Sequence, residues 1–300
     1  MPELPEVETI RRDLAAVILN RRIAFIDILS PKTASHSAAF FKKKLVGRKI
    51  TEVGRRGKLL IFHLSPVKNK GKKTNKKKID YLLIHLKMTG QLIYSDKKNI
   101  IAGGHSLNTR VELEELPNKQ TRAILTLANG GRLFFNDLRK FGYLKLVSQS
   151  ELEKLLANNY GPEPLTPAFT LAAFQESLSR TNVKIKAALL NQKLIAGLGN
   201  IYTDEVLWEA RISPERPTKK ITPPELKKLF AAINKIIKLA VKHRGTTFSD
   251  YVDARGKRGN FSKFLKVYGR SGEKCPNCHN PLKKQKIAER GTHYCPKCQK

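Results

Sequence analysis

The sequence predicts a multidomain α+β protein in which one N-terminal helix, a β domain, a helical domain and a small cysteine-containing module follow one another along the chain. Three observations support this prediction. Apolar residues near the start recur at helical spacing, short segments rich in strand-forming residues come next, and all four cysteines lie at or beyond Cys275. A length of 300 residues is enough for two or three compact units with cores of their own.

The first predicted element is a helix from Pro2 to about Leu19, where apolar residues are spaced three and four apart. Pro2, Glu3 and Glu6 are typical of a helix N-terminus, where they suit the first turn and the helix dipole. A chemical interpretation stands beside this one. Removal of Met1 would leave Pro2 with a free secondary amine, and a terminal amine titrates near ~7.7–8.0 against ~10.4 for a lysine. Unprotonated, such an amine can form a Schiff base with a sugar carbonyl carbon.

A β domain is expected next, because short segments of strand-like composition are separated by Gly, Asn and Pro. Strands at this spacing imply a sandwich or a barrel. Between Lys68 and Lys78 the chain carries seven lysines and almost no apolar residues, which predicts a long solvated loop. The predicted strands cover residues 23–29, 49–53, 59–64, 81–86, 91–94, 123–127, 132–136 and 143–147.

A helical domain is expected after residues 161–167, a proline-containing stretch that is typical of a linker. Thr222 is a suitable N-cap for the last helix, with Pro223 at its first position. A Gly-rich polar stretch from Asp253 to Asn260 then leads to the cysteine module. The predicted helices cover residues 169–178, 186–190, 200–210 and 223–243.

The cysteine module is predicted to hold one structural zinc ion. Cys275 and Cys278 form one C-x2-C pair, and Cys295 and Cys298 form a second after sixteen intervening residues. This spacing matches two knuckles that present four thiolates to one tetrahedral ion. Two disulfides in a secreted module are the alternative, but no signal peptide supports it. The lack of cysteine elsewhere in the chain fits a reducing, cytoplasmic compartment.

The charge of the chain indicates a polyanionic partner. Lysine and arginine number 58 against 25 acidic residues, which gives a formal net charge of +33 at pH 7. Nucleic acid and an anionic membrane surface would both attract such a chain. Since no apolar run approaches the ~18 residues of a membrane span, nucleic acid is the expected partner and no membrane association is expected.

Several turns carry residues that suit phosphate contacts, although an ordinary turn or a solvated surface is the alternative for each. The segment from Gly197 to Asn200 comes directly before a predicted helix, whose free N–H groups could receive a phosphate. Lys58 is the last of three cations in a turn and adjoins the apolar run of a predicted strand. Arg290 lies in the predicted zinc hairpin, where the metal would hold its guanidinium against a phosphate.

Two further turns offer side chains for insertion into a duplex. Arg139 and Phe141 lie between predicted strands, so the ring could wedge between base pairs while the guanidinium reads or fills the exposed edge. Met88, in the turn from His85 to Gly90, is a second candidate wedge. Phe and Met at strand ends are more often core residues, and that alternative stays open for each.

Taken together, these motifs resemble one family, the bacterial formamidopyrimidine-DNA glycosylases, which repair oxidised purines. The resemblance extends over essentially the whole chain. A sister family for oxidised pyrimidines shares the layout, but it typically has Gly at the position of Leu4 and lacks the Arg139–Phe141 pair in this form. The matching segments are residues 2–9, 56–58, 85–90, 137–142, 161–165, 197–202 and 267–270, together with the four-cysteine finger.

This resemblance implies an N-terminal helix plus β-sandwich catalytic domain over residues 1–148, a helix-two-turn-helix DNA-binding domain over 149–260 and a zinc-finger domain over 261–300. It implies a monomer that acts on damaged double-stranded DNA and associates with the nucleoid of the bacterial cytoplasm. It also implies two activities. The enzyme would excise 8-oxoguanine and formamidopyrimidines as a DNA glycosylase, then cleave the abasic site by β,δ-elimination as a lyase, through a Schiff base on the N-terminal proline.

The catalytic residues that the resemblance implies are Pro2, Glu3 and Lys58. The Pro2 amine would attack the sugar C1′ once the damaged base has left the stack. Glu3 would act as general acid and base beside it. Lys58 would grip the phosphates that flank the lesion.

The resemblance implies two groups of DNA-binding residues. Met88, Arg139 and Phe141 would fill the void left by the flipped nucleotide, with Arg139 facing the orphaned base. Phosphate contacts would come from His85, Lys186, Asn200, Tyr268 and Arg290.

Three segments complete the comparison with the family pattern. The stretch from Asp253 to Asn260 matches a loop that closes over the flipped base. Lys140 stands where a second arginine is common, and the insert from Lys68 to Lys78 has no counterpart in the pattern.

Two alternatives stay open from the sequence. One is the sister glycosylase for oxidised pyrimidines. The other is a non-catalytic zinc-ribbon protein that binds nucleic acid, which the basic charge and the ribbon fit equally well. The Pro2-Glu3 terminus does not fit that second alternative, because a binding protein has no use for a free amine beside an acid.

Overall fold

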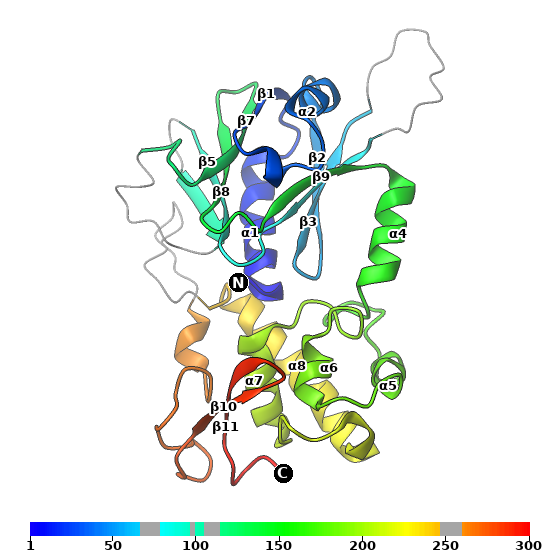
Figure 1. Ribbon diagram of the computed structural model, residues 1–300, viewed down its shortest axis with the longest axis vertical. Helices are drawn as coiled ribbons and strands as arrows, with labels where there is room; N and C mark the ends of the chain where they lie inside the picture. The colour runs from blue at the N-terminus through cyan, green and yellow to red at the C-terminus, as the bar shows by residue number, and fades with distance from the viewer. Residues whose placement is uncertain (67–78, 97–99, 105–114, 247–259) are drawn as a thin grey trace. The chain divides into compact units, whose positions relative to one another are not determined.

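The computed structural model describes residues 1–66, 79–96, 100–104, 115–246 and 260–300 (Figure 1). The predicted loop from Lys68 to Lys78 and nearly all of the Gly-rich stretch from Asp253 to Asn260 lie outside the described residues. The described chain divides into two compact units, Met1–Leu156 and Ala157–Thr246 with Asn260–Lys300. The predicted fold class is confirmed, with a helix and sheets first, helices next and the cysteines last. The boundaries 1–148, 149–260 and 261–300 stay a prediction.

The first unit is a β-sandwich built from two antiparallel sheets. One sheet has the order β1-β7-β8-β5-β6 and the other the order β2-β3-β4-β9. Buried residues of both sheets and of α1 belong to one apolar core. The first sheet contains β1 (Ile23–Ile28), β5 (Gly90–Ser95), β6 (Ile100–Gly104), β7 (Thr121–Leu127) and β8 (Arg132–Asp137). The second sheet contains β2 (Ile50–Arg56), β3 (Leu59–Leu64), β4 (Tyr81–His85) and β9 (Tyr143–Val147).

Helical segments cover the edge strands of both sheets. The helix α1 (Leu4–Ile18) packs against β2 and β6, which are edge strands of different sheets. The helix α2 (Ala38–Leu45) packs against the edge strand β1, and the 3-10 turn η1 (Pro31–Thr33) against the edge strand β9. Because an uncovered edge exposes unpaired backbone groups, these segments protect the sandwich against further strand pairing.

Gly103 permits the close approach of α1 to β6. A Cβ atom at Gly103 would lie 2.3 Å from Cγ1 of Ile10, a distance that real contacts do not reach. Ile10 is itself buried in the shared core. The first helix therefore packs on the sandwich through its apolar face, and the missing side chain of Gly103 leaves the space that Ile10 fills.

Arg48 braces the chain on both sides of the predicted lysine-rich loop. Arg48 is 3% exposed, and its guanidinium donates hydrogen bonds to the carbonyl oxygens of Leu64, Ser65 and Ile79. Leu64 is the last residue of β3, Ser65 follows it, and Ile79 lies shortly before β4. One side chain therefore ties the two ends of the connection together. Burial lowers the pKa of Arg48, and Asp80, 3.9 Å away, opposes the shift.

The second unit contains the helices and the cysteine hairpins. The helix α4 (Gln149–Asn159) crosses the boundary between the units. A β-hairpin is formed by β10 (Lys283–Ile287) and β11 (Arg290–Tyr294), and β11 packs against α7. The remaining helical elements are α5 (Leu171–Ser179), α6 (Ile185–Leu190), α7 (Asn200–Ala210), α8 (Pro223–Lys242) and the 3-10 turns η2 (Thr218–Lys220) and η3 (Phe261–Phe264).

The predicted strands and the five predicted helices are present among the described residues, whereas α2, α4 and β6 were not predicted. The helix α2 buries only Phe41 and Leu45, and α4 buries only Leu152. The apolar pattern of each is therefore too short to predict a helix. The strand β6 was missed because it ends in two glycines, which are poor strand formers. Among the described residues, no helix is both long enough and apolar enough to cross a membrane.

Candidate active site and metal centre

The N-terminus of α1 is built from buried residues. Glu3 is the N-cap of the helix and only 2% of its surface is exposed. Its N–H donates to Oε2 of Glu6 at 2.9 Å, one half of a capping box. Pro2 is buried, whereas Met1 is 46% exposed. If Met1 were removed, the chain would therefore begin at a residue that is buried in this structure.

Lys58 is held beside this terminus in the turn between β2 and β3. Only 5% of Lys58 is exposed, although lysine is usually solvated. Burial lowers the pKa of the Met1 terminal amine below its usual range, Glu3 and Glu6 oppose the shift, and Lys58 adds to it. An amine, two carboxylates and an ammonium group thus lie within electrostatic reach of one another. This environment favours the unprotonated, nucleophilic form of an amine.

Glu8 joins α1 to the turn that carries Lys58. Its carboxylate accepts hydrogen bonds from Arg11 at 2.8 and 3.0 Å, from Arg12 at 2.7 Å and from Arg55 at 3.1 Å. Burial raises the pKa of Glu8, but these arginines outweigh it and hold the pKa at about 2. Arg55 also donates to the carbonyl of Gly57 at 2.9 Å. One carboxylate therefore ties α1, which begins after Glu3, to the turn that carries Lys58.

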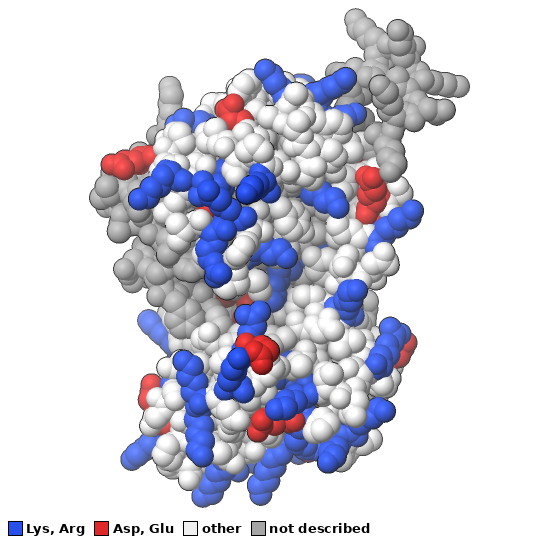
Figure 2. All heavy atoms as spheres, viewed as in Figure 1, with Lys and Arg blue, Asp and Glu red and all other residues white. Residues whose placement is uncertain are grey.

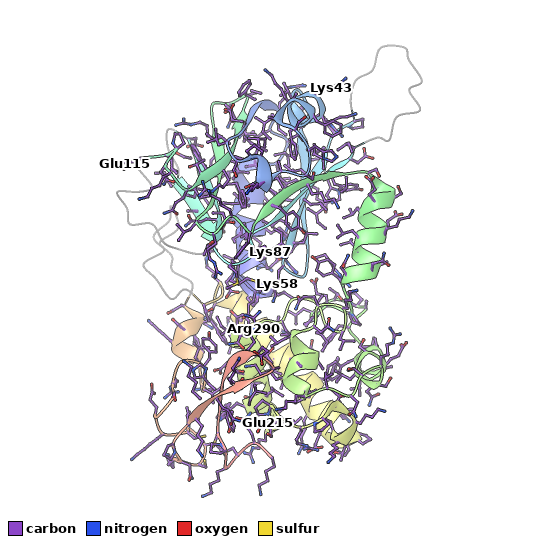
Figure 3. All side chains as sticks on the ribbon, in the orientation of Figure 1. Lys43, Lys58, Lys87, Glu115, Glu215 and Arg290 are labelled. Carbon is purple, nitrogen blue, oxygen red and sulfur yellow. The ribbon has the colours of Figure 1, made fainter. Side chains whose placement is uncertain are left out.

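The turn from His85 to Gly90 has its own internal support. The N–H of Lys87 donates to Nδ1 of His85 at 3.0 Å, so a neutral imidazole carries its proton on Nε2. Burial lowers the pKa of His85 to about 3, and Lys87 and Lys58 act in the same direction. Figure 3 shows Lys58 and Lys87 at one end of the first unit, in agreement with the pairing of Leu59 with His85. Met88 in this turn is partly buried.

Asp137 organises the turn that carries Arg139 and Phe141. Its buried carboxylate accepts hydrogen bonds from the N–H of Gly142 at 2.7 Å, the N–H of Arg139 at 3.2 Å and the Thr89 hydroxyl. Phe141 is 55% exposed, and the Arg139 guanidinium lies 4.9 Å from the centroid of its ring. Asp137 thus ties this turn to the turn of Met88 and holds a large apolar ring in solvent.

In the second unit, Asn200 and Arg290 are brought together by the β10–β11 hairpin. Asn200 begins α7, and its Nδ2 donates to the carbonyl of Gly291 at 2.9 Å. Arg290 is the exposed first residue of β11, next to Gly291 (Figure 3). Tyr268 is partly buried, and its ring meets the ring of His293 edge-on with centroids 5.0 Å apart.

The predicted phosphate contact of Lys186 does not agree with where the structure places this residue. Lys186 has no exposed surface, and its Nζ lies 2.6 Å from Oδ1 of Asp204. A lysine whose ammonium is buried against a carboxylate is not presented to a phosphate on the surface. The sequence pattern could not reveal this, because the partner lies 18 positions away on another helix.

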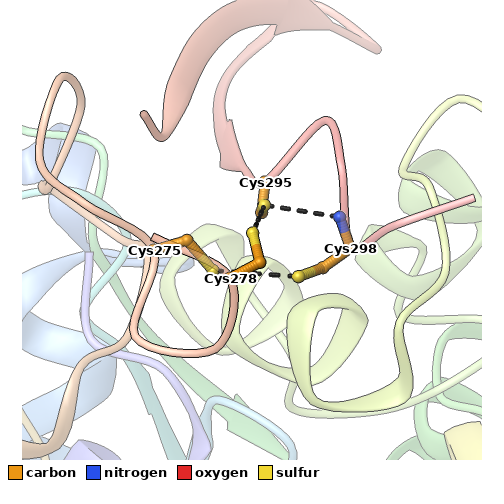
Figure 4. A group of neighbouring side chains, drawn as sticks. All are labelled: Cys275, Cys278, Cys295 and Cys298. Carbon is orange, nitrogen blue, oxygen red and sulfur yellow. Dashed lines mark hydrogen bonds between the residues drawn. The ribbon is translucent and has the colours of Figure 1, made fainter. Parts of the chain in front are cut away.

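The four cysteines form one cluster, with all Sγ atoms within 4.8 Å of one another (Figure 4). Sγ of Cys275 lies 3.9 Å from that of Cys298, and Sγ of Cys278 lies 3.4 Å from that of Cys295. Tetrahedral zinc with Zn–S bonds of about 2.3 Å needs sulfurs about 3.8 Å apart. The donor set therefore fits one zinc ion.

Hydrogen bonds to the sulfurs support the same conclusion, because thiolate ligands are usually oriented by neighbouring donors. Nδ2 of Asn277 lies 3.2 Å from Sγ of Cys298, and the indole nitrogen of Trp208 lies 3.5 Å from Sγ of Cys275. Trp208 belongs to α7, so the cluster is connected to the helix that begins with Asn200.

Models of known protein families match three parts of the chain. The formamidopyrimidine-DNA glycosylase N-terminal domain matches residues 1–144, and the H2TH domain of the same enzymes matches residues 160–252. A zinc finger found in FPG and IleRS matches residues 272–300. The chain belongs to the formamidopyrimidine-DNA glycosylase family. Its four clustered cysteines are accordingly those of an Fpg-type finger with one structural zinc ion.

Relatives of known name cover the whole chain. The formamidopyrimidine-DNA glycosylase of Pelotomaculum thermopropionicum is 40% identical over 302 residues, which span 100% of this chain and 99% of that protein. The enzyme of Enterococcus faecalis is 38% identical and spans 100% and 97%. The Lactococcus lactis Fpg bound to DNA with an abasic site has a TM-score of 0.82 at 35% identity and covers 99% of each chain. MutM bound to DNA with carbocyclic 8-oxo-G has a TM-score of 0.81 at 34% identity, with full coverage.

The surface of this family member is basic over both units on the face that Figure 2 draws, where lysine and arginine side chains are far more numerous than acids. The sequence analysis identified Pro2, Glu3 and Lys58 but missed three acids that support candidate site residues, two in the first unit and one in the second. These are Glu8, Asp137 and Asp204, and each accepts at least one hydrogen bond from a residue far away in the sequence: Arg55, Thr89 and His293, respectively. No local sequence pattern announces such a role.

We predict that the imidazole of His85 stays neutral down to about pH 5. With a folded pKa of about 3 and an unfolded pKa of ~6.5, the unfolded chain binds more protons between these values. The stability of the fold should therefore decrease as pH falls from 6.5 towards 3. The measurement is NMR titration of the histidine ring protons, with His85→Gln to assign the signal. A midpoint near 6.5 for His85 would contradict the prediction.

The single tryptophan gives a direct readout of the metal centre. Because Trp208 donates to Cys275, removal of zinc by a chelator should shift the emission of Trp208 and should be reversed by added zinc. Metal analysis should give one zinc per chain. Emission that does not respond to the chelator, or a purified protein without zinc, would be inconsistent with this centre.

Proposed function

We propose that this protein is a bifunctional DNA repair enzyme that excises oxidised purines, 8-oxoguanine and formamidopyrimidines, and then cleaves the abasic site. The observation that carries the proposal is the N-terminus of α1, where Pro2, Glu3 and Lys58 are buried. Burial lowers the pKa of the terminal amine there, which belongs to Met1, and Lys58 lowers it further. We expect the same surroundings to act on the Pro2 amine once Met1 is removed. Membership of the formamidopyrimidine-DNA glycosylase family supports the substrate class. The solved relatives in complex with damaged DNA support a double-stranded DNA partner.

In the proposed reaction, removal of Met1 frees the secondary amine of Pro2. The amine nitrogen forms a bond to C1′ while the bond from C1′ to the base breaks. The base keeps the electron pair of the broken bond and takes up the proton that the amine nitrogen loses. Glu3 donates a proton to the sugar ring oxygen, which opens the sugar and gives an iminium ion on Pro2. Glu3 is suited to this role because it is buried beside the amine.

The iminium ion then makes strand cleavage possible, because it acidifies the adjacent C2′ proton. Loss of that proton expels the 3′ phosphate by β-elimination, and a second proton loss expels the 5′ phosphate by δ-elimination. Hydrolysis of the iminium releases the sugar fragment and restores the Pro2 amine. The product is a one-nucleotide gap with phosphates at both ends.

The proposed DNA contacts use the turns described above. Lys58, Asn200 and Arg290 bind phosphates that flank the lesion, and Tyr268 adds a weaker contact. His85 is neutral, so it acts as a hydrogen-bond donor from Nε2 rather than as a cation. Met88, Arg139 and Phe141 occupy the space that the flipped nucleotide leaves. We propose further that the enzyme acts as a monomer in the bacterial cytoplasm, on the nucleoid.

We predict that the purified protein cuts a duplex with 8-oxoguanine opposite cytosine and leaves an undamaged duplex intact. A duplex with thymine glycol should be cut at least tenfold more slowly. Glu3→Gln should lose at least 100-fold in single-turnover rate, since general acid–base catalysis contributes about 10²–10⁴-fold. The matched control is Glu52→Gln, which removes an exposed acid from β2.

The rates also separate the alternative functions. Preference for thymine glycol would assign the protein to oxidised pyrimidines instead. Binding of both duplexes without any cut, by a protein that has lost Met1, would leave a non-catalytic DNA-binding protein.

Phe141→Ala should slow excision of 8-oxoguanine much more than cleavage at a pre-formed abasic site, because an abasic nucleotide needs no unstacking of a base. The control is Leu138→Ala, which removes another exposed apolar side chain from the same turn; Leu138 is 49% exposed. The measurement is the ratio of the two single-turnover rates. An equal loss on both substrates would contradict the wedge role of Phe141.

A further inference from the structure

Two adjacent carboxylates on α7, Asp204 and Glu205, are buried, although neither belongs to the proposed chemistry. Asp204 is 1% exposed and Glu205 has no exposed surface. Burying a carboxylate is costly unless charged or hydrogen-bonded partners compensate it. The partners of these two residues are therefore informative about what the helix is built to hold.

Asp204 holds the β10–β11 hairpin. Its Oδ2 accepts a hydrogen bond from the N–H of His293 at 2.8 Å, and its Oδ1 lies 2.6 Å from Nζ of Lys186. The same ammonium group lies 3.4 Å from the carbonyl of Gly291, to which Asn200 also donates at 2.9 Å. The hairpin is thus held at Gly291 and His293 by groups of α6 and α7.

Glu205 holds the turn that precedes the zinc module. Its carboxylate accepts hydrogen bonds from the backbone N–H groups of Lys266 at 2.8 Å, Val267 at 2.9 Å and Tyr268 at 2.8 Å. The two acids therefore face different segments. Asp204 sets the position of the strand that begins with Arg290, and Glu205 sets the position of Tyr268.

The contacts of Asp204 bear directly on phosphate binding. Arg290 is exposed and adjoins Gly291, whereas Asn200 lies one helical turn before Asp204 on α7. A hairpin held only by apolar packing could slide along α7, but hydrogen bonds at Gly291 and His293 fix its register. A buried ion pair seldom adds net stability over an apolar pair, and fixing one geometry is a known use of such pairs.

We propose that Asp204 and Lys186 are positioning residues that set Arg290 beside Asn200, so that both side chains bind one stretch of the DNA backbone. This inference rests on the proposed function, because it assumes that Arg290 binds phosphate. It gives the buried Lys186 a role that differs from the direct phosphate contact predicted from the sequence.

The test is the salt dependence of binding to a duplex that contains a tetrahydrofuran abasic-site analogue. Each phosphate neutralised by a cation contributes about 0.9 to the slope of log K against log salt. Asp204→Asn should lower the slope by about 0.9 and weaken binding about tenfold, as Arg290→Ala does, since Arg290 no longer lies on its phosphate. In an Arg290→Ala background, Asp204→Asn should leave the slope unchanged.

The matched control is Glu209→Gln. Glu209 is on the same helix, and its ion pair with Lys235 is at the surface, so the variant makes the same change in net charge. Its slope should equal that of the unmodified protein. Zinc content and Trp208 emission should be unchanged in every variant, which separates a displaced hairpin from an unfolded finger.

If Asp204→Asn does not fold, the double variant Asp204→Leu with Lys186→Met removes both charges and keeps apolar packing. It should fold and bind zinc, and its slope should still be lower by about 0.9. A slope equal to that of Glu209→Gln would overturn the positioning role. Failure of the unmodified protein to bind this duplex would instead overturn the proposed function, so the two failures are distinguishable.

Discussion

The carboxylate of Glu8 is the constraint on which the proposed active site depends. It lies one to two helical turns beyond Glu3 on α1 and is hydrogen-bonded to Arg55, which also holds the carbonyl of Gly57. Since Gly57 precedes Lys58, the network fixes the backbone of the turn that carries Lys58 relative to α1. With three arginines around it, Glu8 stays ionised at any pH at which the protein would work. The amine site is therefore held by strong charge-assisted hydrogen bonds.

In the second unit, too, buried acids position the segments that carry proposed DNA-binding residues. Its hairpin and its preceding turn carry Arg290 and Tyr268, and neither segment has a large apolar core of its own. The cysteine cluster holds one end, and the buried acids of α7 hold the rest. In each unit, an acid with no proposed contact to DNA, Glu8 or Asp204, supports the segment that carries a cation proposed to bind phosphate, Lys58 or Arg290. Rigid placement of this kind reduces the entropy lost on binding.

Much of the fold could be predicted from the sequence because it depends on local patterns. The apolar spacing of α1 and the cysteine spacing were sufficient for the first helix and the zinc centre. Strand composition predicted a sandwich or a barrel, and the family resemblance favoured the sandwich. The strand β6 could not be predicted, because glycine is a poor strand former. Gly103 is needed there for a different reason, since any side chain at this position would clash with Ile10 of α1. The burial of Lys186 could not be predicted for a related reason. A lysine is expected at the surface, and only the fold brings Asp204 to it.

The central claim is that the amine of Pro2, and not that of Lys58, forms the covalent intermediate. The most direct measurement is to trap the enzyme on 8-oxoguanine DNA with borohydride, digest the adduct and locate the modified peptide by mass spectrometry. The account predicts that the sugar fragment is attached to Pro2 in chains that have lost Met1, and that the adduct persists in Lys58→Ala. A fragment attached to Lys58, or an adduct formed equally well by chains that keep Met1, would contradict it.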